Sequence, residues 1–557
     1  MTYRSLTRAQ KLRLPRRSAI GRSLAIAVGT AMAASSALRA ATFVPPNLNP
    51  GALQQQTLKH KPAPAPASQP AGPVLSGQTP STQSGITEGG PAFTLSRIAF
   101  SSSKFLTPLQ LQALAQPYLH HPIHLADLQK LVARVNALYL KEGYLTARAI
   151  LPPQKITGGL VRIELVEGKL GQVTLKGNSA TWPSYVLSRL PLKAGQVVND
   201  RSLADSLNFF NRTNSVQLKA ALQPGKTFGL TNILLYAQEP RRLTLDLDVD
   251  NYGNPATGRL EGSEYLNVYS PLKLDDRINL YSVQSQGGID NSLSYSIPIT
   301  TWGTRIGVSY EFSNIHIING AYSGIDVRGR SWQVDGSLTQ PLLATQHWYM
   351  QAGFDYSYNS SHTLVGGLDL GPTNVSRESL GLTMQGNFSR GALSLIQTIS
   401  YSRGADPLDN VQHPFIYNGN FYGFFDFTPQ VYASLLSGWQ YTPTNGVSPV
   451  ELFQMGGPYS VRGFQTDGIT GDSGFFSQLE LHYRATTFAD AYVFYDGGVL
   501  FSQYPTEQHE QAMGLGARWT FLKDHITANT WIGFPFNRVL PDQQPYIIGA
   551  QLVFHLP

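Results

Sequence analysis

Residues 348–358, WYMQAGFDYSY, place apolar or aromatic side chains at every even position, with mostly polar or small side chains between them. A repeat of two residues is the period of a β-strand, whose successive side chains point to opposite faces of a sheet. The segments 243–250, 293–299 and 306–312 alternate in the same way, and Gly, Asn, Asp or Pro residues lie between such segments. Strands of about ten residues repeated over the C-terminal half predict a transmembrane antiparallel β-barrel spanning residues 240–557.

The composition agrees with a membrane barrel. Charged residues make up 14% of the 557 residues, against about 25% in typical soluble domains. The chain also contains 27 Tyr, 26 Phe and 52 Gly, which suits strands that face lipid on one side. A large soluble all-β protein would share much of this composition, so the repetition of the pattern is what favours the membrane barrel.

The first forty residues, 1–40, have the layout of a secretory signal peptide, which is removed from the mature protein. Basic residues without any Asp or Glu precede a short apolar run at 23–34 (SLAIAVGTAMAA), and cleavage is expected near Ala37 or Ala40. The absence of Cys agrees with transit through an oxidising periplasm,. Removing the eight basic residues of this segment leaves 34 Lys and Arg against 35 Asp and Glu, so the formal charge of +7 gives no support to nucleic-acid binding,.

Residues 41–92 are rich in Pro, Ala, Gln, Ser and Gly, a composition that predicts a linker because it cannot form a packed core,. The one stretch compatible with a short helix is 51–60, from Gly51 to His60. Its leucines, Leu53 and Leu58, are five residues apart and do not share one helix face. An unstructured segment is therefore the expectation.

Two successive copies of a small α+β unit are predicted before the barrel, over residues 93–170 and 171–239. Each unit is expected to run β-α-α-β-β, and the strongest helix has apolar residues mostly at three- and four-residue steps before it ends at Gly143,. The expected elements of the first unit are 93–100, 107–118, 125–139, 146–151 and 160–166. Those of the second unit are 172–176, 183–190, 200–211, 216–222 and 230–237.

Three segments resemble a known family, the two-partner secretion transporters, which export haemolysins and filamentous adhesins through the bacterial outer membrane. Residues 139–154 (YLKEGYLTARAILPPQ) are similar to part of the family's first polypeptide-transport-associated (POTRA) domain. Residues 455–464 (MGGPYSVRGF) match the V-R-G-F/Y motif of the superfamily, and residues 494–498 (FYDGG) match its F-x-D-x-G motif. The resemblance covers residues 93–557. The residues that carry it are Gly143, Tyr144, Thr146, Arg148, Pro152 and Gln154; Val461, Arg462, Gly463 and Phe464; and Phe494, Asp496 and Gly498.

The resemblance implies a mainly β protein in which a sixteen-stranded outer-membrane barrel follows two POTRA domains in the periplasm. It implies a translocator that captures an unfolded partner exoprotein and exports it through the barrel pore without nucleotide hydrolysis. The implied partners are a secreted, β-helical, adhesin- or haemolysin-like exoprotein, the outer-membrane lipids and the barrel assembly machinery. A helix at 51–60 would then be a candidate plug of the lumen.

One feature departs from the family pattern. Barrels of this kind usually end on an aromatic residue, which the assembly machinery recognises. In this chain Phe554 is followed by His555, Leu556 and Pro557.

Alternation over 491–499 places Asp496 on one face with Tyr492, Phe494 and Gly498. If the residues between them face lipid, Asp496 points into a polar lumen and offers an arginine a bidentate partner.

The resemblance implies that Arg462 lies in a long loop folded back into the barrel. Gly463 would let that loop turn sharply, Gly498 would leave room at the wall, and Phe464 would wedge against it. We hypothesise that the Arg462–Asp496 ion pair holds the loop in its conducting arrangement. The alternative is a solvated surface arginine.

The edges of the small domains suit an unfolded substrate, because strand addition reads the main chain rather than specific side chains. For Tyr144, Arg148, Pro152 and Gln154, the simpler interpretation is that they shape the turn of their own domain.

The sequence predicts neither an enzyme nor a cofactor or metal site. His120, His121, His124 and Asp127 lack a matching ligand cluster, so a structural or surface role is expected,. No G-x-S-x-G, P-loop or zinc signature occurs,. The alternatives to an exporter are an insertase of the same superfamily, a passive porin and a soluble periplasmic enzyme.

Overall fold

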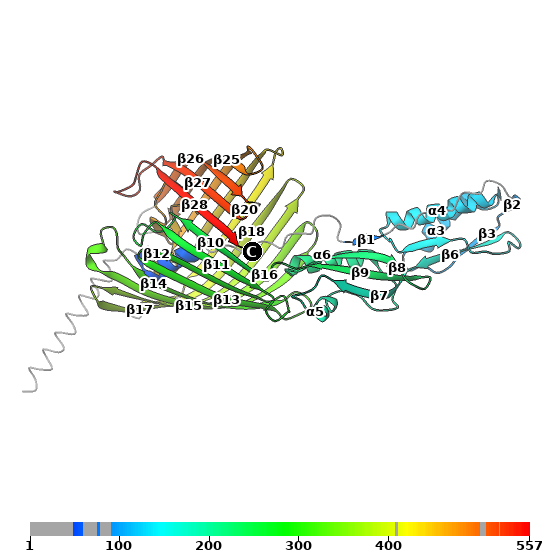
Figure 1. Cartoon of the computed structure of the whole chain (residues 1–557), viewed down its shortest axis with the longest axis horizontal. Helices are drawn as coiled ribbons and strands as arrows, with labels where there is room; N and C mark the ends of the chain where they lie inside the picture. Colours follow the sequence, from blue (N-terminus) through cyan, green and yellow to red (C-terminus); the bar gives the residue numbers. More distant parts are fainter. Residues whose placement is uncertain are drawn as a thin grey trace, which may run out of the picture.

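The computed structural model describes residues 48–59, 75–77, 91–406, 410–501, 508–522 and 524–556. The predicted signal peptide and most of the predicted linker lie outside these ranges. Figure 1 shows a barrel from which two small domains extend in a row to one side.

The C-terminal part is a closed antiparallel barrel, as the alternation predicted. Its last strand pairs with its first, with Leu245 opposite Leu556 and Asp250 opposite Gln551, so the sheet has no free edge,. The barrel strands are β10 (Leu243–Asp250), β11 (Glu261–Tyr269), β12 (Arg277–Ser285), β13 (Gly288–Pro298), β14 (Arg305–His316), β15 (Val327–Ala344), β16 (Trp348–Val365), β17 (Leu368–Phe388), β18 (Gly391–Ala405), β20 (Phe415–Asp426), β21 (Val431–Tyr441), β24 (Ser473–Arg484), β25 (Ala489–Phe501), β26 (Gln508–Phe521), β27 (Ile526–Pro535) and β28 (Ile547–Leu556).

These sixteen strands are the number that the family resemblance implies. A two-residue strand, β19 (Val411–Gln412), adds to β18 beyond the main ladder. Strand β25 shows the two faces: Val493 and Tyr495 are exposed on the outside, whereas Tyr492 and Phe494 are buried inside.

The first small domain packs two helices on a sheet of order β3-β6-β5. Tyr139, Leu131 and Val135 of its long helix are buried against Val161 and Ile163 of the sheet. Its elements are β2 (Phe93–Thr94), β3 (Arg97–Phe100), α3 (Pro108–Ala115), η2 (Gln116–Tyr118), β4 (Pro122–Ile123), α4 (Leu125–Lys141), β5 (Ala147–Ile150) and β6 (Leu160–Glu167).

The single strand expected at 93–100 is divided in the structure. The amides of Ser96 and Arg97 both donate to the carbonyl of Gly159, at 2.9 and 3.2 Å. This contact leaves β2 to pair with β4 and β3 to pair in parallel with β6.

The second small domain repeats the arrangement around a sheet of order β1-β8-β9-β7. Leu203, Leu207 and Phe210 of its long helix are buried against Ile233 and Leu235. Its elements are β7 (Lys169–Lys176), α5 (Pro183–Leu187), α6 (Asp200–Thr213), β8 (Gln217–Pro224) and β9 (Leu230–Gln238). The added edge strand β1 (Leu75–Gly77) comes from the predicted linker and pairs in parallel with β8.

The second domain sits on turns at one end of the barrel, which we call the near rim. Asp275, fully buried in the β11–β12 turn, accepts a hydrogen bond from the amide of Ser215 and pairs with Arg305, both at 2.8 Å. Arg212 of α6 donates to the carbonyl of Thr345 in the β15–β16 turn at 3.2 Å. Two hydrogen bonds of buried charged groups therefore fix this domain to the barrel: Asp275 accepts a main-chain amide of the domain, and Arg212 of the domain donates to a main-chain carbonyl of the rim.

A helix, α2 (Pro50–Lys59), lies inside the barrel against β14, β15 and β16, and Figure 1 shows it in blue. The expectation of an unstructured segment is therefore wrong over these residues. The leucine spacing misled because the lumen is polar, so this helix needs no continuous apolar stripe. Ala52, Leu53, Gln54 and Gln56 are all buried. His60 lies outside the described residues.

The contacts of α2 are made by amides and hydroxyls. The side-chain oxygen Oε1 of Gln54 accepts from the hydroxyl of Ser331 and from Asn359 Nδ2, the latter at 3.2 Å. Gln454 donates to the Ala52 carbonyl at 3.1 Å. Among the described residues, no helix is both long and apolar enough to cross a bilayer.

Deleting residues 50–59 should raise the ion conductance of the purified protein in planar bilayers. A helix about 10 Å across would leave the lumen, and an aqueous path would replace it. Replacing residues 61–70 by a Gly/Ser segment of equal length is the matched control, because it keeps the length of chain between α2 and β1, and it should leave conductance unchanged. Equal conductance of the two variants and the intact chain would contradict an obstructing role for α2.

Candidate functional site

The connection between β21 and β24, residues 442–472, folds back into the barrel; we call it the lumenal loop. Within it, β22 (Phe453–Met455) and β23 (Ile469–Gly471) pair as an antiparallel ribbon, with Met455 opposite Ile469. The tip of this ribbon carries the V-R-G-F motif, and Val461, Arg462 and Phe464 are all buried.

Arg462 binds Asp496 of the barrel wall, as the sequence predicted. Its Nε donates to Asp496 Oδ2 at 2.7 Å and its Nη2 donates to Oδ1 at 2.8 Å. The Arg462 backbone amide also donates to Oδ2, at 3.0 Å. The two side chains are 4% and 0% exposed, so the solvated-arginine alternative does not apply.

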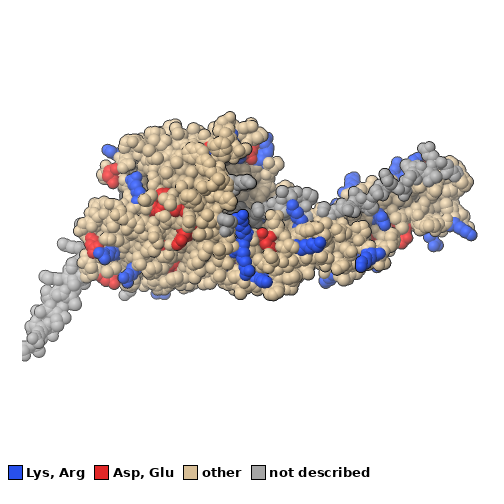
Figure 2. Space-filling model, viewed as in Figure 1, with Lys and Arg blue, Asp and Glu red and all other residues tan. Residues whose placement is uncertain are grey.

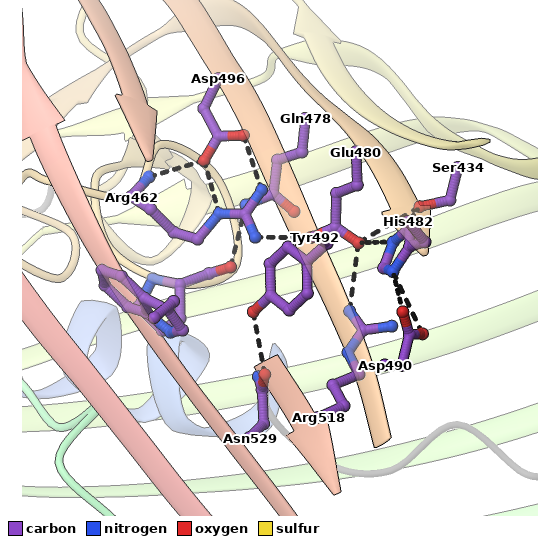
Figure 3. A network of polar contacts seen from close by, with 12 residues as sticks. Ser434, Arg462, Gln478, Glu480, His482, Asp490, Tyr492, Asp496, Arg518 and Asn529 are labelled. Atoms are coloured by element: carbon purple, nitrogen blue, oxygen red, sulfur yellow. Dashed lines mark hydrogen bonds and ion pairs between the residues drawn. The ribbon is translucent and has the colours of Figure 1, made fainter. Parts of the chain in front are cut away.

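The guanidinium binds a second carboxylate, which was not among the residues predicted from the sequence. Arg462 Nη1 donates to Oε1 of Glu480, which lies on the neighbouring strand β24 (Figure 3). A signal for it was present, because Gln478, Glu480 and His482 alternate with the outward-facing Leu479 and Leu481. These polar residues face the lumen on a strand close to the predicted arginine partner, Asp496. Such a pattern indicates a second carboxylate that can accept from Arg462.

Glu480 is itself held from the side away from Arg462. His482 Nε2 lies 2.8 Å from Glu480 Oε2, and Arg518 Nη2 donates to the same oxygen at 3.1 Å. The other ring nitrogen of His482 lies 3.3 Å from Asp490. Figure 3 shows the carboxylates and cations alternating along this wall.

Aromatic rings complete the surroundings of the cations. The guanidinium carbon of Arg462 lies 3.6 Å from the centroid of the Phe494 ring, and that of Arg518 lies 5.0 Å from the Tyr492 ring. A desolvated cation above an aromatic ring gains about 2 kcal/mol. Phe494 of the F-x-D-x-G motif therefore contacts the arginine directly.

The glycines of both motifs allow close approach. Gly463 has φ of +94°, and a Cβ there would lie 3.2 Å from Ala512 Cβ and 3.2 Å from the Gly533 carbonyl carbon. At Gly498, a Cβ would lie 2.3 Å from Met455 Sδ of the lumenal loop. Phe464 packs in one buried cluster with Val461, Met455, Ile469, Leu500 and Ala512.

These contacts make the loop and the wall mutually dependent. Two buried carboxylates and one buried guanidinium are tolerated only while they neutralise one another, since an unpaired buried charge costs several kcal/mol. The bidentate geometry also fixes the direction of the arginine. The arrangement can hold a segment in one position inside a water-accessible pore.

Most residues of the POTRA-like motif lie at the junction between the two small domains. The Thr146 amide donates to Asp200 of α6 at 3.2 Å. Tyr144 and Gly143 lie beside Arg201; the Arg201 guanidinium carbon is 5.5 Å from the Tyr144 ring centroid, and a Cβ at Gly143 would lie 3.0 Å from Arg201 Nε. Burial raises the pKa of Asp200 to about 6, although the hydrogen bond from Thr146 opposes this shift.

Arg148 also faces the second domain, with its guanidinium carbon 5.5 Å from the ring centroid of Phe228. In contrast, Gln154 bonds within its own domain. Its side chain accepts from the amide of Arg162 at 2.8 Å and donates to the Arg162 carbonyl at 2.7 Å and to the Pro152 carbonyl at 3.3 Å.

The histidines considered for a metal site lie in the connection before α4. Asp127 accepts from the backbone amide of His124 at 3.0 Å, which caps the helix and lowers the pKa of this carboxyl. In the part of the chain that the structure describes, no three His, Asp or Glu side chains are grouped to hold a metal ion.

Comparison with known proteins gives matches over most of the chain. Residues 229–521 match the family model of the haemolysin secretion/activation protein ShlB/FhaC/HecB, and residues 93–168 match the ShlB-type POTRA domain model. The outer membrane transporter CdiB of Escherichia coli O6:K15:H31 is 26% identical over 526 residues, covering 88% of this chain and 86% of that protein. The heme/hemopexin transporter protein HuxB of Haemophilus influenzae strain Rd is 26% identical over 45% of each chain.

The solved structure of CdiB from Escherichia coli has the same fold. It superimposes with a TM-score of 0.65 at 22% identity and covers 91% of this chain and 99% of its own.

Arg462→Ala and Asp496→Ala should each loosen the lumenal loop by about 3–5 kcal/mol, because each leaves a buried charge without its partner. The double variant should cost less than the two single variants together. Hydrogen–deuterium exchange of residues 453–471 measures the loosening. Additive effects of the two substitutions would argue against a direct pair.

Gly463→Ala should expose the lumenal loop more than Gly446→Ala. Both glycines have positive φ and lie in the same loop, but a Cβ at Gly446 meets nothing within 4 Å. Both variants carry about 1–2 kcal/mol of backbone strain, and only Gly463→Ala adds contact with the wall. The same exchange measurement compares them, and equal effects would mean that close packing at Gly463 contributes nothing.

Proposed function

Since this chain belongs to the haemolysin secretion/activation family, we propose a route by which it exports its partner protein. The chain is a two-partner secretion transporter of the bacterial outer membrane, its near rim faces the periplasm, and its two small domains are POTRA domains. In the proposed route, the POTRA domains capture the unfolded exoprotein by strand addition. The exoprotein then passes through the lumen after α2 has left it, without nucleotide hydrolysis.

The pairing of β1 with β8 carries this proposal. Three residues of an extended segment, Leu75–Gly77, already add to the free edge of the second POTRA sheet in parallel register with Ala220, Ala221 and Leu222. Pairing of this kind uses main-chain groups and tolerates many sequences. An unfolded exoprotein can use the same edge, and it would then displace β1.

Displacement of β1 would act on the lumen through the chain itself. Helix α2 and strand β1 are joined by residues 60–74. Capture of the exoprotein at β8 therefore frees the segment that follows α2. We infer that capture and unblocking are coupled in this way.

Different interactions hold the two obstructions of the lumen. Helix α2 is held by neutral amide and hydroxyl hydrogen bonds such as that of Gln54, each worth about 0.5–1.5 kcal/mol. The lumenal loop is held by the buried ion pairs of Arg462 with Asp496 and Glu480, whose disruption costs about 3–5 kcal/mol. We propose that α2 leaves during export while the loop stays in place.

The POTRA motif residues are assigned a structural role in this proposal. Gly143, Tyr144, Thr146 and Arg148 set the angle between the two POTRA domains through their contacts with α6 and Phe228. Pro152 and Gln154 fix the turn before β6.

The finer identity of the partners is also a proposal. We infer a β-helical exoprotein of adhesin or haemolysin type, because the relatives include the hemolysin transporter protein ShlB of Serratia marcescens. The barrel assembly machinery and the outer-membrane lipids are the partners expected of its membrane insertion. Phe554 lies in the closing strand β28 opposite Leu247, and we propose that it supplies the aromatic signal despite the three residues after it.

An insertase or a passive porin would give different phenotypes on gene deletion. Loss of one secreted protein supports the exporter. Broad loss of other barrels would indicate an insertase, and altered uptake of small solutes would indicate a porin.

Proline substitutions should separate the two strands at the β8 edge. Ser76→Pro should increase binding of the exoprotein's N-terminal fragment, because it weakens the β1 strand that occupies the edge. Ala221→Pro should decrease binding, because proline removes a main-chain donor from the β8 strand. Surface plasmon resonance with the exoprotein whose secretion is lost on deletion of this gene measures both. Strand addition at this edge would be wrong if neither variant changed the affinity.

A further inference from the structure

Exposed aromatic side chains stand at the near rim of the barrel. Each near-rim hairpin connection from β13–β14 onward carries at least one at a turn or strand end. Rings at this level are the aromatic girdle of membrane barrels, because they combine an apolar body with tolerance of the headgroup region. The girdle residues are Trp302, Trp348, Phe388, Phe427, Phe488 and Phe521.

The first near-rim turn, between β11 and β12, breaks this pattern. Its residues 270–276, SPLKLDD, contain no aromatic residue, and Tyr269 at the end of β11 is buried. Leu272 is 57% exposed there, but it is the one large apolar side chain of the turn that is well exposed.

A tryptophan from the second POTRA domain lies on this same turn. The backbone amide of Trp182 donates to the carbonyl of Lys273 at 3.0 Å. The Lys273 ammonium lies 4.9 Å from the centroid of the indole ring. Trp182 is nevertheless 51% exposed, so the protein covers only about half of a large apolar side chain.

The position of Trp182 is fixed from both sides. The neighbouring Thr181 hydroxyl hydrogen-bonds to that of Tyr269 of β11 at 3.1 Å. At the other end of α5, Arg189 donates to the carbonyl of Thr300 in the next near-rim turn at 2.9 Å. The tryptophan is therefore held at the level of the girdle. It lies on the β11–β12 turn, and the next near-rim turn carries Trp302.

We propose that Trp182 inserts into the headgroup region of the periplasmic leaflet and supplies the girdle residue that the β11–β12 turn lacks. The occupant of this surface is a phospholipid leaflet. Leu272, next to Lys273 in the turn, would add its exposed side chain to the contact, and the Lys273 ammonium would bind a lipid phosphate. Figure 1 shows α5 at the edge of the barrel, and Figure 2 shows Lys and Arg side chains where the barrel meets the POTRA domains.

This contact gives the second POTRA domain two attachments. Its docking on the near-rim turns fixes it to the barrel, and Trp182 fixes the same end to the bilayer. An indole at an interface is stabilised by its apolar ring and by its polar N–H together.

Cysteine labelling tests the proposal cleanly, because the chain contains no Cys. Trp182→Cys, Trp302→Cys and Phe228→Cys are labelled singly with an environment-sensitive nitrobenzoxadiazole dye in nanodiscs of phosphatidylethanolamine and phosphatidylglycerol. Position 302 is the membrane reference. Position 228 is the aqueous reference, an exposed aromatic in the same POTRA domain on the side facing the first one. The label at 182 should be blue-shifted and quenched by nitroxide-labelled lipids to the extent of the label at 302.

A label at 182 that behaves as the label at 228 would overturn the proposal. Heat-modifiable migration on gels confirms a folded barrel for each variant. As a second measurement without a dye, hydrogen exchange of α5 should be slower in nanodiscs than in lipid-free detergent for the natural chain and for Trp182→Phe. Trp182→Ser should lose this difference; its persistence in the serine variant would also contradict the proposal.

Discussion

The arrangement of the lumen depends on burying one guanidinium, that of Arg462, between two carboxylates. Inside a barrel, with little water at the contact, none of these charges is stable alone, and each is tolerated only because the others neutralise it. The loop is therefore attached at Asp496 and Glu480, which lie on adjacent strands and both point into the lumen. Glycines at 463 and 498 are consequences of this attachment, because the loop backbone and Met455 must approach the wall closely for the guanidinium to reach both acids.

The same lumen holds its second occupant by another kind of contact. Helix α2 presents glutamines and main-chain carbonyls to hydroxyls and amides, so its removal exposes polar groups that water can satisfy,. Removal of the loop would take Arg462 away from Asp496 and Glu480, and these two carboxylates would remain partly shielded from water at the wall. Removing the loop from the lumen therefore costs more electrostatic free energy than removing the helix. For this reason we expect the helix to move and the loop to stay in place.

The sequence predicted what depends on local pattern and short motifs, and it failed where partners are distant. Alternation was enough for the barrel strands, and the facing of Asp496 together with the family resemblance around Arg462 was enough for that ion pair. Glu480 was missed because its place beside Arg462 depends on the register of β24 against β25. The junction role of Thr146 could not be foreseen, since its acceptor Asp200 is 54 residues away. The prediction for α2 used the rule that a buried helix needs an apolar stripe. That rule does not hold in a polar lumen, where a helix can be buried with polar side chains facing the wall.

The rigid docking of the second POTRA domain restricts how exoprotein capture reaches the pore. The fully buried Asp275, which pairs with Arg305 within the barrel, accepts the main-chain amide of Ser215 from the POTRA domain, and Arg212 of that domain binds a main-chain carbonyl of another turn. A domain held in this way cannot swing away from the rim without breaking the hydrogen bonds that two buried charged groups, Asp275 and Arg212, make across the contact,. Movement of the whole domain is therefore a costly means of opening the lumen. The segment between β1 and α2 offers a less costly path, because β1 is attached at β8 by only three paired residues and α2 by neutral bonds. Strand exchange at the POTRA edge breaks only weak contacts, and it leaves both the docked domain and the Arg462 ion pairs intact.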